Sequence, residues 1–108
     1  MTDRVAATPQ PPYWAVIFSN VQAEAVDGYG AMAEAMERLA ALQPGYLGFE
    51  SARSGLGISI SYWSDLDAIA AWKRQVDHLA AQRMGRERWY AAYRVRVARV
   101  ERDYGFQR

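Results

Sequence analysis

The sequence contains no cysteine and a single histidine, His78. The missing thiols exclude disulfides, thiolate metal sites and a cysteine nucleophile. One imidazole per copy also excludes a histidine-rich metal centre and a catalytic pair of histidines within one chain. The longest apolar runs are too short to span a bilayer, and the N-terminus shows no targeting segment. We therefore expect a cytoplasmic protein that does not bind membranes.

What the sequence does contain suffices for one compact domain, because 51% of its 108 residues are hydrophobic. The formal charge of +1 is unevenly distributed. Residues 1–82 hold five basic and nine acidic side chains, whereas residues 83–108 hold eight arginines and three acidic side chains. The arginines of the second region alternate with apolar residues and are mixed with acidic ones, as on a solvated or dimer-facing strand. We therefore expect no nucleic-acid partner.

Hydrophobic periodicity predicts a single domain over residues 13–108, preceded by a flexible, proline-rich arm at residues 1–12. The predicted order is strand, helix, strand, strand, helix, strand. The strands are expected at residues 13–19, 46–53, 57–63 and 93–102, and the helices between residues 27 and 44 and from 65 to about 84. This order is typical of the α+β, ferredoxin-like βαββαβ fold, a four-stranded antiparallel sheet with both helices on one face.

Three local features refine this prediction. Asp27 is expected to cap the first helix, and Ser64 the second, because both residue types accept hydrogen bonds from the first helical turn. Val95 and Val97 give way to Ala98 and Val100 in the last strand, a change of phase that predicts a β-bulge there.

The predicted strands are apolar on both faces, although the helices cover only one of them. A chain of this length has nothing left to cover the second face. We therefore expect a homodimer in which sheet packs on sheet.

Two segments are similar to a known family. Residues 45–50 (GYLGFE), and residues 60–65 (ISYWSD) followed by a helix that carries Trp72 and His78, resemble the antibiotic biosynthesis monooxygenase family of dimeric α+β barrels. Residues 85–106 resemble an uncharacterised branch of it. Its members include cofactor-independent monooxygenases, haem-degrading enzymes and proteins with no known activity. The resemblance implies the fold above, a dimer seam that includes the C-terminal strand, and a small hydrophobic or aromatic ligand.

The resemblance carries over to single positions only in part. Trp63 matches a tryptophan at the end of the third strand that is important in both the oxygenases and the haem degraders. Ser59 stands where the oxygenases have an asparagine, and Gln82 stands where the haem degraders have an axial histidine. The haem degraders also use an asparagine on the first strand, for which Asn20 is a candidate. A haem-binding function would therefore need His78, one turn earlier, as the iron ligand.

Each candidate residue has a structural and a functional interpretation. Trp63 is either a core aromatic or a platform for a ligand ring. Ser59 and Ser61 share its face of the strand and are either polar handles of a pocket or small residues below bulky ones such as Trp72. His78 is the single imidazole of the chain, and is either a general base or a solvated side chain.

Arg83 is the last candidate residue. It either stabilises a substrate phenolate or is a charge at the end of the second helix. The sequence thus predicts a cofactor-independent monooxygenase or a small aromatic-ligand-binding protein, with catalytic residues Trp63 and His78. Ser59, Ser61, Trp72 and Arg83 are the expected substrate-binding residues. No cofactor and no metal site are expected, because glycine-rich phosphate loops and ligand clusters are missing. The alternatives are a non-catalytic, stress-associated dimer and a haem-binding or haem-degrading protein.

Overall fold

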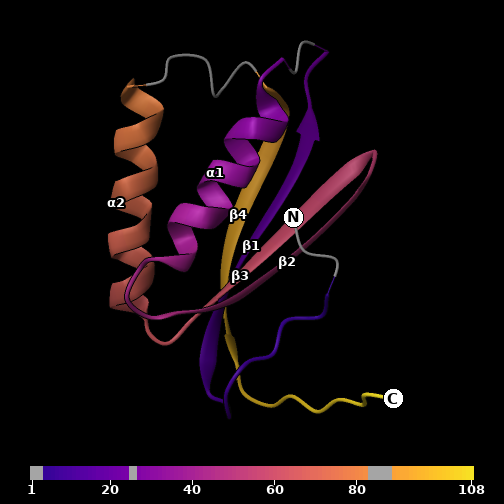
Figure 1. Ribbon diagram of the computed structural model, residues 1–108, viewed down its shortest axis with the longest axis vertical. Coiled ribbons are helices and arrows are strands. Elements are labelled where there is room, and N and C mark those ends of the chain that lie inside the picture. Colours follow the sequence, from indigo (N-terminus) through magenta and orange to yellow (C-terminus); the bar gives the residue numbers. More distant parts are fainter. Residues whose placement is uncertain (1–3, 25–26, 83–88) are drawn as a thin grey trace.

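A computed structural model describes residues 4–24, 27–82 and 89–108, with the backbone only for residues 79–82 (Figure 1). Its elements follow the predicted order. They are β1 (Tyr13–Gln22), α1 (Tyr29–Ala41), β2 (Tyr46–Ser54), β3 (Leu56–Trp63), α2 (Leu66–Gln82) and β4 (Tyr90–Val100). Neither helix in this described part of the chain is long and apolar enough to cross a membrane.

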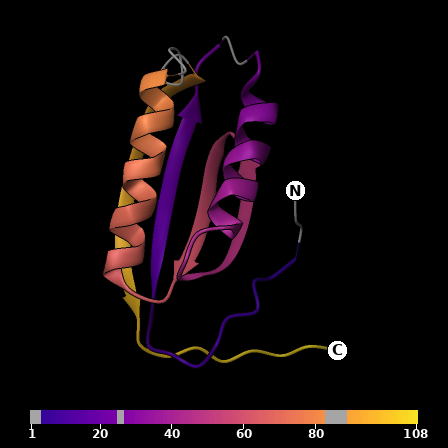
Figure 2. The same ribbon diagram turned by 60° about the vertical axis from the view of Figure 1, so that its left-hand side comes forward.

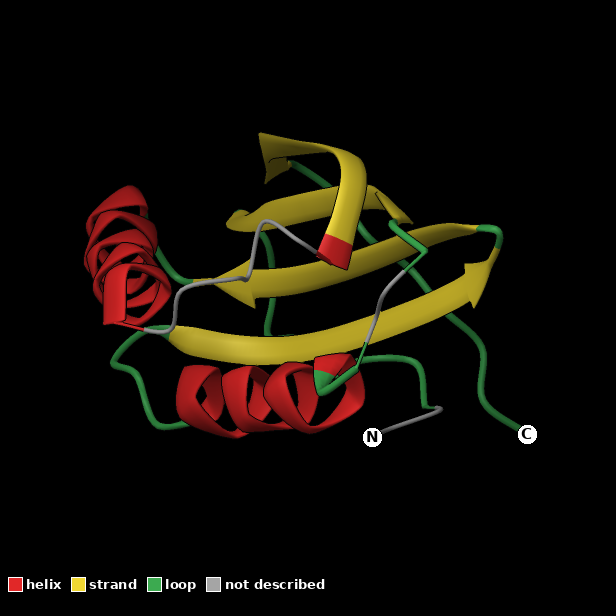
Figure 3. Cartoon of the chain, turned by 90° about the horizontal axis from the view of Figure 1, so that it is seen from above, coloured by secondary structure: helices red, strands yellow, loops and turns green. Residues whose placement is uncertain are grey.

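The four strands form one antiparallel sheet in the order β2-β3-β1-β4. Strands β1 and β3 lie in the centre, each paired with a neighbour along both edges. Figure 2 shows α1 and α2 on the same side of the sheet, with β1 visible between them. Seen from above, the strands form a twisted layer and the helices lie next to it as separate rods (Figure 3). The predicted α+β, ferredoxin-like fold is therefore confirmed.

The alternation of β3 decides which side chains meet the helices. Trp63 at the end of β3 stacks on Trp72 of α2, with ring centroids 6.0 Å apart. Ser59 and Ser61 share its face by the period of two, whereas Ile58 and Ile60 lie on the outer face of the sheet. We call the side of the sheet that carries Ser59, Ser61 and Trp63 the helix-facing side, and the side that carries Ile58 and Ile60 the outer face.

The described part of the N-terminal arm, residues 4–12, contains no helix or strand and contacts the sheet. The backbone N–H of Ala6 donates to Glu50 Oε2 at 2.9 Å, and Thr8 Oγ1 donates to the hydroxyl of Tyr13 at 2.9 Å. These contacts lie at the end of the outer face where β1 begins. Flexibility of residues 1–12 stays a prediction.

The prediction that Asp27 caps α1 is wrong. The N-cap is Gly28, whose φ of 82° is left-handed, and no side chain hydrogen-bonds the first turn. Asp27 instead offers its backbone carbonyl to the indole N–H of Trp89, at 2.9 Å. A capping side chain has to come from the residue directly before the helix, and Asp27 lies one position too far upstream.

The cap of α2 is also displaced, from the predicted Ser64 to Asp65. The Ala68 N–H donates to Asp65 Oδ1 at 2.8 Å, and Ser64 Oγ donates to Asp65 Oδ2 at 3.0 Å. The Ser64 N–H is bound to the Gly45 carbonyl of the preceding loop at 2.8 Å. Because the Ser64 hydroxyl bonds the Asp65 carboxylate, Asp65 accepts from the first turn, and the helix starts one residue later than predicted.

The predicted bulge in β4 is misplaced. Pairing of β4 with β1 continues without interruption from Val100 to Ala92, and the shift occurs between Val21 and Gln22. Strand β4 carries valines on both faces, with Val97 opposite Val16 and Val100 opposite Tyr13. The change of apolar phase therefore reflects two apolar faces and not an inserted residue.

Candidate functional site

Trp63 is the most deeply buried large side chain of the candidate site. It is 0% exposed and lies at the end of β3 on the helix-facing side. Its Nε1–H donates to Ser61 Oγ at 2.9 Å. Its ring lies nearly parallel to Trp72, at 25°, and meets Tyr46 of β2 edge-on at 5.7 Å. The site is thus an indole held between a helix and a strand, with its one polar atom satisfied.

The two serines lie next to this indole along β3. Ser61 is buried and accepts the Trp63 hydrogen bond, and its own hydroxyl hydrogen stays available for a second partner. Ser59, one pleat further, is half-buried and pairs with Phe18 of β1 and Ser51 of β2. Small polar side chains therefore follow Trp63 along the helix-facing side of β3.

His78 lies in α2 but not beside Trp63. It is six residues after Trp72, which places it about 120° around the helix from the side that meets the sheet. Its side chain is exposed. Arg83 lies outside the described residues, as does the side chain of Gln82. Of the predicted site residues, the structure brings together Trp63, Ser61 and Trp72, with Ser59 next along the strand.

Two tyrosines on the outer face, Tyr62 and Tyr13, have hydrogen bonds that the sequence did not predict. The hydroxyl of Tyr62 donates to Glu50 Oε1 at 2.5 Å, and burial followed by this hydrogen bond raises the pKa of Tyr62. Tyr13 hydrogen-bonds Asp103, and burial is the main cause of its raised pKa. The two rings meet edge-on at 5.8 Å. Both phenols are therefore held in the neutral form. Tyr13 holds the C-terminal segment through Asp103, and Tyr62 holds Glu50, which binds the N-terminal arm at Ala6.

A second missed group lies at the opposite end of the helix-facing side. Arg53 of β2 donates to Asn20 Oδ1 and, at 3.3 Å, to the hydroxyl of Tyr29 in α1. Asn20 is 2% exposed and donates to the Gly57 carbonyl at 3.4 Å. The sequence offers one signal for this group, because the hairpin turn at Gly55 places Arg53 opposite Gly57.

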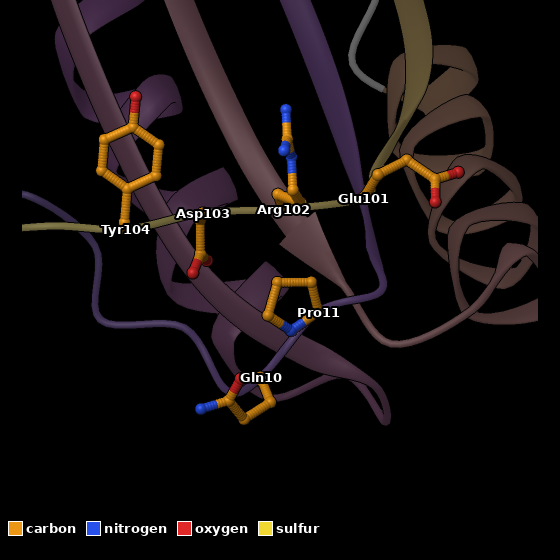
Figure 4. Close-up of a pocket in the computed structure, with 6 residues that line it drawn as sticks. All are labelled: Gln10, Pro11, Glu101, Arg102, Asp103 and Tyr104. Atoms are coloured by element: carbon orange, nitrogen blue, oxygen red, sulfur yellow. The ribbon is translucent and has the colours of Figure 1, made fainter.

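A surface hollow of about 430 Å³ lies between the two terminal segments (Figure 4). Gln10 and Pro11 come from the N-terminal arm, and the remaining lining residues, Glu101, Arg102, Asp103 and Tyr104, follow β4. None of the predicted site residues lines it. Among residues 4–24, 27–82 and 89–108, no group of three histidine, aspartate or glutamate side chains could hold a metal ion.

The sequence profile of the family described as "Antibiotic biosynthesis monooxygenase" matches residues 12–84. The chain belongs to the antibiotic biosynthesis monooxygenase family. The matched region begins just before β1 and contains Trp63 and both serines. The resemblance noted in the sequence is thereby confirmed.

Relatives of this family member are similar over nearly their whole length. The "Uncharacterized protein YqjZ" of Bacillus subtilis is 52% identical over 109 residues, which cover 99% of this chain and 96% of that protein. The structure of SnoaB, described as "a cofactor-independent oxygenase from Streptomyces nogalater", superposes with a TM-score of 0.66 at 13% identity, over 91% of this chain and 100% of that one. PA3566 from Pseudomonas aeruginosa also gives 0.66, at 15% identity, over 89% and 99%. At these identities the two structures show the shared fold alone.

Proposed function

We propose that this family member is a homodimer that binds a small aromatic molecule beside Trp63 and oxidises it with molecular oxygen without a cofactor. One observation carries the proposal. Trp63, at the position that the resemblance marks as functional, lies on the helix-facing side of the sheet with its ring stacked on Trp72 and its N–H held by Ser61. Family membership and the overall likeness to a structure described as a cofactor-independent oxygenase support it.

The surroundings of Trp63 suit a flat, electron-rich ligand. Trp63 is fully buried, so it is the half-buried Trp72 of the stacked pair that offers an apolar surface to a ligand ring. Ser61 keeps a hydroxyl hydrogen that can be donated to a carbonyl of the ligand, and Ser59 offers a second hydroxyl one pleat away. A hydroxylated anthrone combines these features, since it has a planar ring system and a carbonyl.

Such a substrate supplies its own electrons to oxygen. Loss of a proton from the anthrone gives an electron-rich anion that reacts with O₂. One oxygen atom becomes the new ring carbonyl, and the other leaves as water with the two hydrogens of the oxidised methylene. The protein's part is to bind and orient the ring and to favour the anion.

The decisive experiment measures oxygen consumption with 1,8-dihydroxyanthrone as the probe. We expect wild type to consume one O₂ per anthrone faster than buffer does, and Trp63→Phe to lower kcat/KM by at least about tenfold. Trp89→Phe is the matched control, because Trp89 contacts Tyr29 and not Trp63, and it should stay within about twofold. Equal rates for wild type and buffer would reject the oxygenase. Binding of the probe without consumption would leave the non-catalytic dimer as the function.

The role of His78 is tested in the same assay. A general base contributes about 10²- to 10⁴-fold to a rate. Because His78 is exposed and lies about 120° around α2 from Trp72, we expect His78→Ala to lower the rate by less than about threefold. A loss of about a hundredfold or more would restore His78 as the base.

The homodimer in this proposal is supported by the outer face of the sheet. Ile58, Leu56 and Val21 are 38%, 52% and 43% exposed there, an apolar surface typical of an interface. Light scattering should give twice the chain mass of 12.2 kDa. Ile58→Glu should halve that value, whereas Leu42→Glu, on the exposed end of α1, should not change it. A monomeric wild type at micromolar concentration would reject the dimer.

A further inference from the structure

A guanidinium lies at the end of the helix-facing side opposite to Trp63. Arg53 of β2, Gly57 of β3 and Asn20 of β1 form one row across the sheet, since Arg53 pairs with Gly57 and Gly57 pairs with Asn20. Gly57 lies six positions before Trp63 in β3, a distance of about 20 Å along the strand. This row therefore lies at the opposite end of the helix-facing side from Trp63, with Ser59 and Ser61 between them.

Three neighbours fix the position of the Arg53 guanidinium. Its Nη2 donates to the buried Asn20 amide oxygen and to the Tyr29 hydroxyl, and its Cζ lies 5.7 Å from the centre of the Tyr29 ring. The third neighbour is Gly57. A Cβ there would overlap the guanidinium, at 2.8 Å from Nη1 and closer still to Cζ and Nη2. The arginine thus lies directly over a glycine, where any other residue would displace it.

The Arg53 guanidinium, although fixed in position, still has N–H groups that can donate to a ligand. Of its five N–H groups, the two on Nη2 face Asn20 and Tyr29, and the three on Nε and Nη1 have no hydrogen-bond partner among the described residues. Within that same part of the chain, no carboxylate lies within 4.0 Å of it, and the first turn of α1 contains no acidic residue. Arg53 is exposed, so its charge is accessible to a ligand.

Aromatic rings surround the same row. We call the aromatic cluster the set formed by Phe18, Tyr29, Trp89, Tyr90 and Tyr93. Tyr29 contacts Tyr90 at 5.7 Å, and Phe18 contacts Tyr90 at 5.3 Å and Tyr93 at 5.5 Å. Tyr93 pairs with Asn20 and is 50% exposed. The cluster is therefore continuous from the arginine to an exposed ring on the far side of Asn20.

We propose that Arg53 and the aromatic cluster form a second binding site, for an aromatic carboxylate. The carboxylate pairs with the free N–H groups of Arg53, and the aromatic ring packs on the exposed part of the cluster at Tyr93. Asn20 and Gly57 are positioning residues, because they hold the guanidinium and touch no ligand. This site lies beyond the proposed oxygenase function and does not depend on it.

Calorimetry with 2-naphthoate and its neutral counterpart 2-naphthamide tests the site. Wild type should bind the carboxylate at least about tenfold more tightly than the amide, since a charge-assisted hydrogen bond distinguishes them. Arg53→Gln and Gly57→Ala should both reduce this preference to less than about twofold, with binding of the amide retained. Gly57→Ala keeps the arginine and moves it, so it tests position separately from charge.

Two matched controls accompany these variants. Arg38→Gln removes an exposed positive charge on α1, and Gly30→Ala adds a methyl group where nothing lies within 4 Å. Both should keep the wild-type preference. Equal affinity of wild type for the two probes, or an unchanged preference in Arg53→Gln, would overturn the proposal. Trp63→Phe should leave the preference intact, so failure of the oxygenase assay and failure of this site are separate results.

Discussion

The two ends of the sheet differ in how completely they are packed. At the end where β1 begins, Trp63 is covered on the helix-facing side, and Tyr62 and Tyr13 are hydrogen-bonded on the outer face. At the end where β1 finishes, Tyr93 is half exposed on one side and Leu56 on the other. The end where β1 begins is therefore the more buried and contributes more to stability. The end where β1 finishes keeps polar and aromatic groups accessible for binding.

Substitution of Trp63 should change the free energy of unfolding most, and so tests the difference between the two ends of the sheet. Trp63→Ala leaves a cavity between β3 and α2 and removes a fully buried indole, so we expect the free energy of unfolding to fall by about 3–5 kcal/mol. Arg53→Ala at the other end should cost about 1–2 kcal/mol, because it removes the donor to the buried Asn20 amide oxygen but leaves no large apolar cavity. Urea denaturation measures both. Equal losses would show that the two ends contribute alike.

A smaller effect is expected from the outer face of the packed end. Tyr62→Phe removes the hydroxyl that donates to Glu50, at a cost of about 1 kcal/mol near pH 7. The raised pKa of Tyr62 also fixes the pH dependence. In the unfolded chain the phenol ionises near its ordinary pKa of 10.0 and in the folded chain only above it, so wild-type stability falls as pH rises beyond about 10.

Denaturation between pH 8 and 11 checks this prediction. Tyr62→Phe should show a shallower loss of stability than wild type, and Tyr13 and Tyr46, whose pKa values are also raised, account for the loss that remains. A variant that loses stability as steeply as wild type would assign the pH dependence to other groups.

The smallest effect concerns the loop that joins Trp63 to α2. Hydrogen bonds from Ala68 and Ser64 lower the pKa of Asp65, so its charge stabilises the fold above the ordinary carboxyl pKa and this contribution is lost as pH falls through the lowered value. Asp65→Ala should lower Tm at pH 7, whereas Asp65→Asn should recover most of it because asparagine caps helices equally well. Ser64→Ala, at the predicted cap, should change Tm less than Asp65→Ala.

Several features of this protein follow from local sequence. The alternation of residues 58–63 determined which side chains share a face with Trp63, because a strand has a period of two. The order of apolar segments determined the ferredoxin-like fold, since short connections leave few ways to pair four strands. Residues 45–50 and 60–65 also pointed to the family that the profile match confirmed.

Other features were decided by tertiary contacts. The Ser64 amide is bound to a distant loop at Gly45, and the cap of α2 is Asp65. The exposed position of His78 follows from the side of α2 that Trp72 turns toward the sheet. Arg53 gains its partners from three different elements, β1, β3 and α1. Periodicity fixes the face of each residue within its own element, but pairing and packing between elements determine which faces meet.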